Sequence, residues 1–482
     1  MASMTKNFVY NILYQILAFI SIVITTPYIS RVISVDEIGK YSYTQSIVTY
    51  FTLAAALGIT LYGRKEIAFS QDNRSNYSKK FWNITVLKII TTAVTLTIYF
   101  ILFVIRYNQY RYFFLIQSLD ILAIAFDITW FFQGMENFKI IVIRNSIIKL
   151  ISIISIFAFV KDESDIYIYI LSISLSTLIG YVTLWPKAFS YVDALDVSSL
   201  KPLKHLIPAA ALFLPQIVIN IYTISDKTMI GLLTGSDAQN GYYEQSQKII
   251  RLLQAVITSF GNVTAPRIAY YFASNNKKGI QKCIDTSARL VWFLGIPMTL
   301  GLLSVSNAFV PWYFGEGYAP VIPLLNVFSV LTIVIGLSNI SGTQYMINTN
   351  KQRLFLISVL SGAILNVCLN YILIPRFLAL GAAIASVIAE CAITFIQFFM
   401  IRKEVNIKQM FSCAGKYCIA GIGMFIALYF FPDTNFIIQV MKGATIYFIF
   451  LLLQKEKNVL LIIDFAFKTV DNLLKRVFGE EK

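Results

Sequence analysis

Long apolar runs separated by short polar connections occupy most of the chain. Each run is about 20 residues long, the length that a helix needs to cross the ~30 Å hydrocarbon core of a bilayer. The pattern predicts an all-α polytopic membrane protein with about 14 transmembrane helices. The predicted spans are 8–30, 41–62, 81–105, 112–132, 140–160, 166–186, 207–233, 242–265, 290–311, 318–340, 354–375, 380–401, 411–431 and 436–454.

Composition agrees with this pattern and excludes several other classes of protein. Of the 482 residues, 57% are apolar and 13% are charged, whereas soluble domains are about 45–50% apolar and about 25% charged. The five cysteines form no C-x-x-C pair, the single histidine lies in a lysine-rich segment, and no G-x-x-x-x-G-K-[ST] run is present. We therefore expect no metal site, no cofactor and no ATPase activity, and we predict that the protein is not an enzyme.

The basic residues predict the orientation of the chain. The net charge of +15 would suggest a nucleic-acid partner in a soluble protein, but here it favours loops that face an anionic membrane surface. With the N-terminus inside, 28 of the 40 Lys and Arg residues fall in inner segments or near the inner ends of spans, and 6 fall in outer segments. This bias predicts that both termini are cytoplasmic, and we interpret the first run as a retained span. Apolar residues at helical spacing after residue 454 predict an amphipathic helix on the cytoplasmic face, with partner binding as the alternative.

A repeated motif predicts how the spans are organised. Gly39-x-Tyr41-x-x-x-Gln45-x-Ile47 opens the second span, and Gly241-x-Tyr243-x-x-x-Gln247-x-Ile249 opens the eighth. The two copies are six spans apart, so they have the same orientation, as in transporters built from parallel repeats. We therefore predict two six-helix lobes over 1–205 and 206–405, followed by two extra helices and the tail over 406–482.

Several segments resemble the bacterial lipid-linked oligosaccharide flippases, and they are distributed over nearly the whole chain. They include YNILYQILAFISIVITTPYISRVI, GKYSYTQSIVTYFTLAAALGITLYGRKEIA, FFQGMENFKIIVIRNSIIKL, IYTISDKTMIG, GYYEQSQKII and LNVCLNYILIPRFLALGAAIASVIAE. These flippases are the Wzx-type exporters of capsule and O-antigen repeat units, within the multidrug/oligosaccharidyl-lipid/polysaccharide exporter superfamily. The resemblance implies a two-lobed transporter that moves undecaprenyl-diphosphate-linked oligosaccharide to the outer leaflet of the bacterial cytoplasmic membrane. Other polysaccharide-assembly membrane proteins are candidate partners.

Charged residues within the seventh and eighth spans are candidates for binding the diphosphate. Glu244, Lys248 and Arg251 are spaced i, i+4, i+7 on one helix face beside Gln247, and Asp226 and Lys227 lie at a similar depth. Three cations against two acids leave a net positive charge, which suits an anionic head group. The alternative is that these residues form ion pairs that only hold the two helices together. Arg31, at the outer end of the first span, either contacts the diphosphate or lies at the interface.

Acids within other spans are candidates for coupling to an ion gradient. Asp120 and Asp127 lie with Gln117 in the fourth span, and Glu390 lies in the twelfth. Because the chain carries no ATPase motif, we predict that H⁺ or Na⁺ supplies the energy through such buried carboxylates. The alternative for the fourth span is an acid paired with Lys88 or Lys149.

Three other functions are compatible with a polytopic membrane protein. A multidrug/ion antiporter of the same superfamily would have an apolar, acid-bearing cavity, which the cations of the eighth span disfavour. A membrane-embedded polysaccharide polymerase is expected to have a large external loop, whereas the longest external segment here has about ten residues. A scramblase or scaffold is the third alternative, and the charges near mid-membrane argue against a scaffold.

Overall fold

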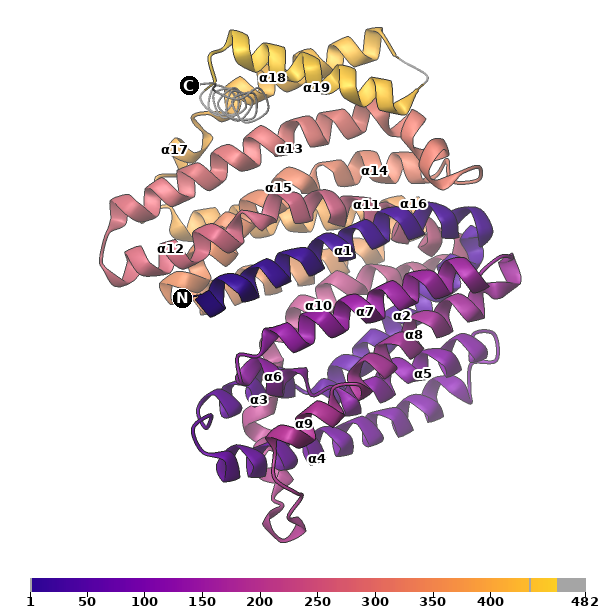
Figure 1. The fold of residues 1–482 in the computed structure, drawn as a ribbon. Coiled ribbons are helices and arrows are strands. Elements are labelled where there is room, and N and C mark those ends of the chain that lie inside the picture. Colours follow the sequence, from indigo (N-terminus) through magenta and orange to yellow (C-terminus); the bar gives the residue numbers. More distant parts are fainter. Residues whose placement is uncertain (1, 433–434, 457–482) are drawn as a thin grey trace, which may run out of the picture. The chain divides into compact units, whose positions relative to one another are not determined.

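The computed structural model describes residues 2–432 and 435–456, with side chains described except at 2–13 and 214–222. This part of the chain is helical and contains no strand (Figure 1). Eleven of its helical segments are long and apolar enough to cross a membrane. One of them, α16 (Gln352–Ile401), contains a kink at Leu378, where φ is 55° and ψ is −136°. The kink separates the predicted spans 354–375 and 380–401.

The predicted fold class is confirmed, since the remaining two predicted spans are also helices. They are α10 (Leu206–Thr234) and α11 (Asp237–Ser259), which lie outside the eleven apolar segments. α11 begins five residues before the predicted span and ends at Ser259, after which α12 (Gly261–Ala273) follows. The predicted C-terminal amphipathic helix lies outside the described residues.

The chain divides into two compact units, which are described separately. Unit 1 contains the residues up to Lys248 together with Phe314–Tyr318 and Ala363–Ser386. Unit 2 contains Ile249–Tyr313, Ala319–Gly362 and the chain from Val387 onward. The lobe boundaries at residues 205 and 405 stay a prediction.

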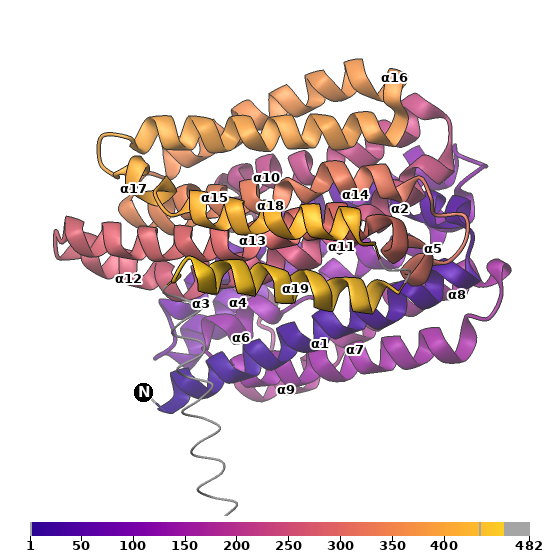
Figure 2. The ribbon, with the colours of Figure 1, turned by 90° about the horizontal axis from the view of Figure 1, so that it is seen from above.

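Unit 1 is built mainly from the first ten helices. α5 packs against both α2 and α8, α1 packs against α7, and α10 packs against α2 and α3 (Figures 1 and 2). Apolar side chains such as Phe81, Trp130 and Phe131 fill the space between α3, α4 and α6. The helices are α1 (Ala2–Val32), α2 (Val35–Ala56), α3 (Ile59–Ala68), α4 (Arg74–Tyr99), α5 (Arg111–Phe126), α6 (Thr129–Gly134), α7 (Phe138–Phe159), α8 (Ile166–Val182), α9 (Trp185–Tyr191) and α10.

Two of the predicted spans in unit 1 are interrupted. Leu57 and Gly58 have φ values of 41° and 70° and separate α2 from α3. A Cβ at Gly58 would lie 2.5 Å from the Ala209 carbonyl oxygen, so the break and the approach of α10 both require glycine. The predicted span 112–132 is likewise broken between α5 and α6, with Asp127 in an extended conformation. Asp120 therefore lies within α5, whereas Asp127 lies at the break and not within a continuous fourth helix.

Unit 2 is built around the long helix α13 (Lys277–Phe314). Trp292 and Phe293 on α13 lie in one apolar core with Met424 of α18 and Tyr447 of α19. α18 and α19 pack side by side, and α12 packs against a π-helical turn, η5 (Asn339–Met346) (Figure 1). Its other elements are α14 (Val321–Ser329), α15 (Leu331–Ser338), η6 (Ile347–Thr349), the two ends of α16, α17 (Ile407–Phe411), α18 (Ala414–Phe430) and α19 (Phe436–Leu453).

Candidate functional site

The hairpin between α10 and α11 brings three of the predicted charged residues together, namely Lys227, Glu244 and Lys248. α10 ends at Thr234, Gly235 adopts the left-handed conformation with φ of 63°, and α11 begins at Asp237. Lys227 lies seven residues before the end of α10, and Glu244 lies seven residues after the start of α11. With a rise of 1.5 Å per residue, both are about 10 Å from the turn, so they meet across the hairpin.

Glu244 is the centre of this cluster. It forms an ion pair with Lys227, its Oε1 lies 3.9 Å from Lys248 Nζ, and Ser42 of α2 donates a 3.3 Å hydrogen bond to its Oε2. The side chains of Glu244, Lys227 and Lys248 are 12%, 14% and 20% exposed. One acid is thus shared by two cations that keep some access to their surroundings.

The cations lie further along α11 than the bounds of the predicted span suggest. Because α11 begins at Asp237 rather than near residue 242, Lys248 lies about 16 Å along the helix from its start. Arg251 lies one turn further, with an exposed side chain, on the part of α11 that belongs to unit 2. Arg31, at the end of α1, is exposed and lies beside Gly315.

Asp226 lies in a separate, buried network of hydrogen bonds in unit 1. Its side chain is 3% exposed. Tyr243 donates a hydrogen bond of 2.5 Å to Oδ2, Ser386 donates one of 2.6 Å to the same oxygen, and Asn370 donates one of 2.6 Å to Oδ1. Three donors thus surround one carboxylate, and both of its oxygens accept hydrogen bonds.

The surroundings of Asp226 are rich in oxygen atoms. Asn370 also donates to Asn366 at 3.1 Å, and Ser225 donates to Asn366 at 3.4 Å. Among the described residues, the buried Asn370 Oδ1 accepts no hydrogen bond. Gln247 donates to Tyr243 at 3.1 Å, so this predicted residue joins the network through the tyrosine.

Sequence reasoning missed four members of this network. Tyr243 was seen only as part of the repeated motif, and Ser386 gives no signal in an apolar segment. Asn366 and Asn370 do give one, because two amides at i and i+4 within the apolar run 354–375 are costly unless they are hydrogen-bonded.

The remaining candidates are not brought into either cluster by the contacts described. Gln45 of α2 donates a 3.3 Å hydrogen bond to Asp120, while Gln117, one turn before it, is buried. Glu390 is half-buried in unit 2, on the second half of α16. A role of Asp120 or Glu390 in ion coupling stays a prediction.

Asp127 forms an ion pair with Lys88, which is the alternative to ion coupling given above for the fourth span. Lys88 Nζ donates to Asp127 Oδ2 at 2.9 Å and to the Asp127 carbonyl oxygen at 2.7 Å. The backbone N–H and hydroxyl of Thr129, the first residue of α6, donate to Oδ1 at 3.0 and 2.6 Å. The pair therefore satisfies the polar groups that the α5–α6 break exposes.

A polytopic helical protein with charged clusters inside its spans has the architecture of a membrane transporter. The family model described as "Polysaccharide biosynthesis protein" matches residues 4–272. The chain belongs to this family, as the resemblance to the Wzx-type flippases predicted.

Individual relatives agree with this assignment. A putative O-antigen transporter of Escherichia coli K12 is 24% identical over 406 residues, covering 83% of this chain and 97% of the relative. The inward closed conformation of the lipid II flippase MurJ has the same fold, with a TM-score of 0.73 at 16% identity, covering 94% of this chain and 99% of the solved one. An inward-facing multidrug MATE transporter of the MOP superfamily has a TM-score of 0.62 at 12% identity, covering 81% and 99%.

Proposed function

We propose that this protein is a flippase that moves undecaprenyl-diphosphate-linked oligosaccharide repeat units from the cytoplasmic to the outer leaflet of the bacterial cytoplasmic membrane. The repeat units would serve the synthesis of capsule or O-antigen polysaccharide, and both termini of the chain would be cytoplasmic. The family assignment and the similarity to an O-antigen transporter and a lipid II flippase support a lipid-linked saccharide as the substrate.

The observation that carries the proposal is the sharing of Glu244 between Lys227 and Lys248. Here α10 and α11 place two lysines on one acid, and Arg251 follows one turn further along α11. A diphosphate that leaves water needs several cations around it, and arginine can bind it bidentately. In the proposed mechanism Lys227, Lys248 and Arg251 hold the diphosphate, and Arg31 contributes at the outer end of α1.

The experiment is to measure binding and flipping of undecaprenyl-diphosphate oligosaccharide with purified Arg251 variants in vesicles. We expect Arg251→Ala to lower flipping by at least about a hundredfold, since charge-assisted contacts are worth about 1.5–3 kcal/mol each and a bidentate contact supplies two. Arg251→Lys keeps the positive charge but loses the paired N–H donors of the guanidinium. Its flipping rate should therefore lie between those of Arg251→Ala and wild type. A folded Arg251→Ala protein that binds and flips the lipid like wild type would place the diphosphate site elsewhere.

We further propose that flipping is driven by an H⁺ or Na⁺ gradient through Asp226. A buried carboxylate surrounded by amide and hydroxyl oxygens, one of them without a hydrogen-bond donor, supports this role. Asp226→Asn should abolish the response of flipping to an imposed gradient, and Ser386→Ala should weaken it. Asp120→Asn and Glu390→Gln are the comparison variants. If flipping by Asp226→Asn responds to the gradient like wild type, while flipping by Asp120→Asn or Glu390→Gln does not, the acid replaced in the unresponsive variant is the coupling residue.

A further inference from the structure

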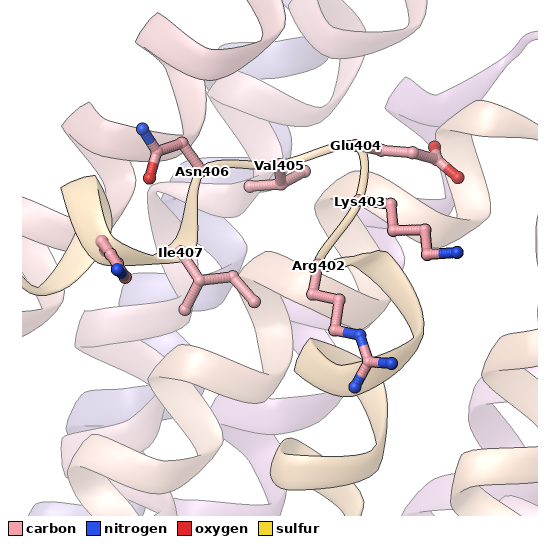
Figure 3. A pocket seen from close by; sticks show the side chains of 7 residues that line it. Arg402, Lys403, Glu404, Val405, Asn406 and Ile407 are labelled. Atoms are coloured by element: carbon pink, nitrogen blue, oxygen red, sulfur yellow. The ribbon is translucent and has the colours of Figure 1, made fainter.

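A basic hollow lies in unit 2 at the connection between α16 and α17. It is open, has a volume of about 560 Å³, and is lined by Arg402, Lys403, Glu404, Val405, Asn406, Ile407 and Lys408 (Figure 3). Arg402 and Lys403 extend to the same side of the loop, whereas Asn406 points away from them (Figure 3). The volume is within the range of small-molecule sites, about 300–1,000 Å³.

The loop that forms this hollow is held in place from within unit 2. Ile401 and Val405 are 1% and 3% exposed and belong to the apolar core of the unit. The Asn406 backbone N–H donates to Gln281 Oε1 of α13 at 2.9 Å, and Gln281 Nε2 donates to the Asn406 carbonyl oxygen at 3.2 Å. The basic side chains therefore project from a fixed backbone, which lowers the entropy cost of binding a ligand.

The one acid of the hollow already has partners. Glu404 forms an ion pair with Lys351 and accepts a 2.5 Å hydrogen bond from Tyr345. Arg402, Lys403 and Lys408 are exposed and line the same hollow. The hollow thus presents three cations while its carboxylate is neutralised by a lysine outside its lining, so it favours an anion.

An aromatic strip on α16 leads from the hollow toward the apolar part of the helix. The Arg402 guanidinium lies 3.6 Å from the centroid of the Phe399 ring, and Phe399 stacks on Phe395 with centroids 6.5 Å apart. Phe399 and Phe395 are 53% and 71% exposed. Stacking leaves the N–H edge of the guanidinium available for a phosphate, and the strip extends about 10 Å along the helix.

We propose that this hollow binds an anionic phospholipid of the leaflet that it faces. The phosphate lies against Arg402, Lys403 and Lys408, and one acyl chain lies along Phe399 and Phe395. The charge favours an anionic over a zwitterionic head group, and the adjoining aromatic strip favours a lipid over a free phosphate. This site is separate from Glu244 and Asp226 and does not depend on the proposed substrate.

The test is a lipid titration of the full-length protein in detergent, followed by native mass spectrometry. The probes are phosphatidylglycerol, phosphatidylcholine of the same chains, and sn-glycerol 3-phosphate, which lacks chains. We expect phosphatidylglycerol to bind at least about tenfold more tightly than the other two. Arg402→Gln with Lys403→Gln should weaken its binding by about 25-fold, because each basic residue near an anionic lipid contributes roughly fivefold.

The matched control removes two charges from α13 of the same unit. Lys278 and Lys282 are exposed and do not line the hollow, so Lys278→Gln with Lys282→Gln should change binding by less than about threefold. Equal losses in both double variants, or none in the first, would overturn the proposal, as would equally tight binding of glycerol phosphate. Should the first double variant fail to fold, Lys403→Gln with Lys408→Gln leaves Arg402 on Phe399 and tests the same site.

Discussion

Two of the places in unit 1 where a lysine meets an acid differ in stoichiometry and in exposure. At the α5–α6 break, one lysine meets one acid, and the side chains of Lys88 and Asp127 are 1% and 9% exposed. At the α10–α11 hairpin, two lysines share Glu244, and all three side chains are 12–20% exposed. The first arrangement is buried and matches one cation with one acid, whereas the side chains of the second stay partly exposed.

This difference separates a structural ion pair from a candidate binding site. A buried pair gives little net stabilisation, but removing one partner leaves a buried charge without compensation and costs about 3–5 kcal/mol. A shared, partly exposed acid can lose one lysine and still keep the other. The exposure of the charged side chains therefore distinguishes the two clusters more clearly than their position within a predicted span.

The largest effect is expected from breaking the closed pair. Lys88→Met should destabilise the protein by about 3–5 kcal/mol and lower the midpoint of heat-induced loss of the monodisperse protein by roughly 10 °C. The measurement is size-exclusion chromatography in detergent after heating. Adding Asp127→Asn to Lys88→Met should recover much of the loss, since no buried charge then remains and an amide can still accept from Thr129.

Lys149→Met is a suitable control for this prediction. Lys149 lies half-buried on α7 of the same unit, and its replacement removes a lysine without touching the α5–α6 break. If Lys88→Met melts at the same temperature as wild type, the Lys88–Asp127 pair does not stabilise the α5–α6 connection. The proposed difference between this structural pair and the hairpin cluster would then be wrong.

A smaller effect on stability, but a loss of transport, is expected at the hairpin. Lys248→Gln leaves Glu244 paired with Lys227, so stability should change by less than about 1 kcal/mol. Flipping of the lipid-linked oligosaccharide in vesicles should fall at least about tenfold, because one charge-assisted contact is lost. Lys248→Arg should retain most of the transport.

A charge swap distinguishes the two interpretations of this cluster. Lys227→Glu with Glu244→Lys exchanges the partners of the ion pair that the structure contains. Recovery of both folding and transport in the double variant would show that the pair only joins α10 to α11. Recovery of folding without transport is the result that we expect from a binding site.

Sequence analysis predicted the fold well because its signal is long and redundant. Each span spreads its apolar signal over about 20 residues, so the helices were found even where their ends were displaced. The misplaced ends have local causes, such as the left-handed Leu57–Gly58 turn and the extended Asp127. Single residues with unusual backbone angles leave little trace in hydropathy.

The candidate site was predicted less completely, because its contacts depend on packing between distant segments. Helical spacing placed Glu244 and Lys248 together, and the hairpin added Lys227. Which residues of α10 and α11 face each other, however, follows from where α10 ends and α11 begins. The hydrogen-bond donors to Asp226 come from α11 and from both sides of the kink in α16, and the α16 donors are 144 and 160 positions away from it along the chain. The i, i+4 spacing of Asn366 and Asn370 marks them as a polar pair, but no periodicity within one helix could have assigned Asn370 or Ser386 to Asp226.

The smallest effect is expected at an acid–lysine contact outside the spans, between Glu404 and Lys351. The side chain of Glu404 is 44% exposed, so this contact should be worth less than either cluster of unit 1. Burial raises the pKa of Glu404, but hydrogen bonds from Lys351 and Tyr345, with Lys277 nearby, outweigh it and hold the pKa below its ordinary value of 4.5. A lowered folded-state pKa means that the contact stabilises the protein above about pH 4.5 and is lost as the pH falls through the folded value. Glu404→Gln should therefore melt slightly below wild type at pH 7 and converge with it near pH 3. A difference as large at pH 3 as at pH 7 would mean that the glutamine disturbs packing, and that an exposed carboxylate at this position adds nothing through its charge.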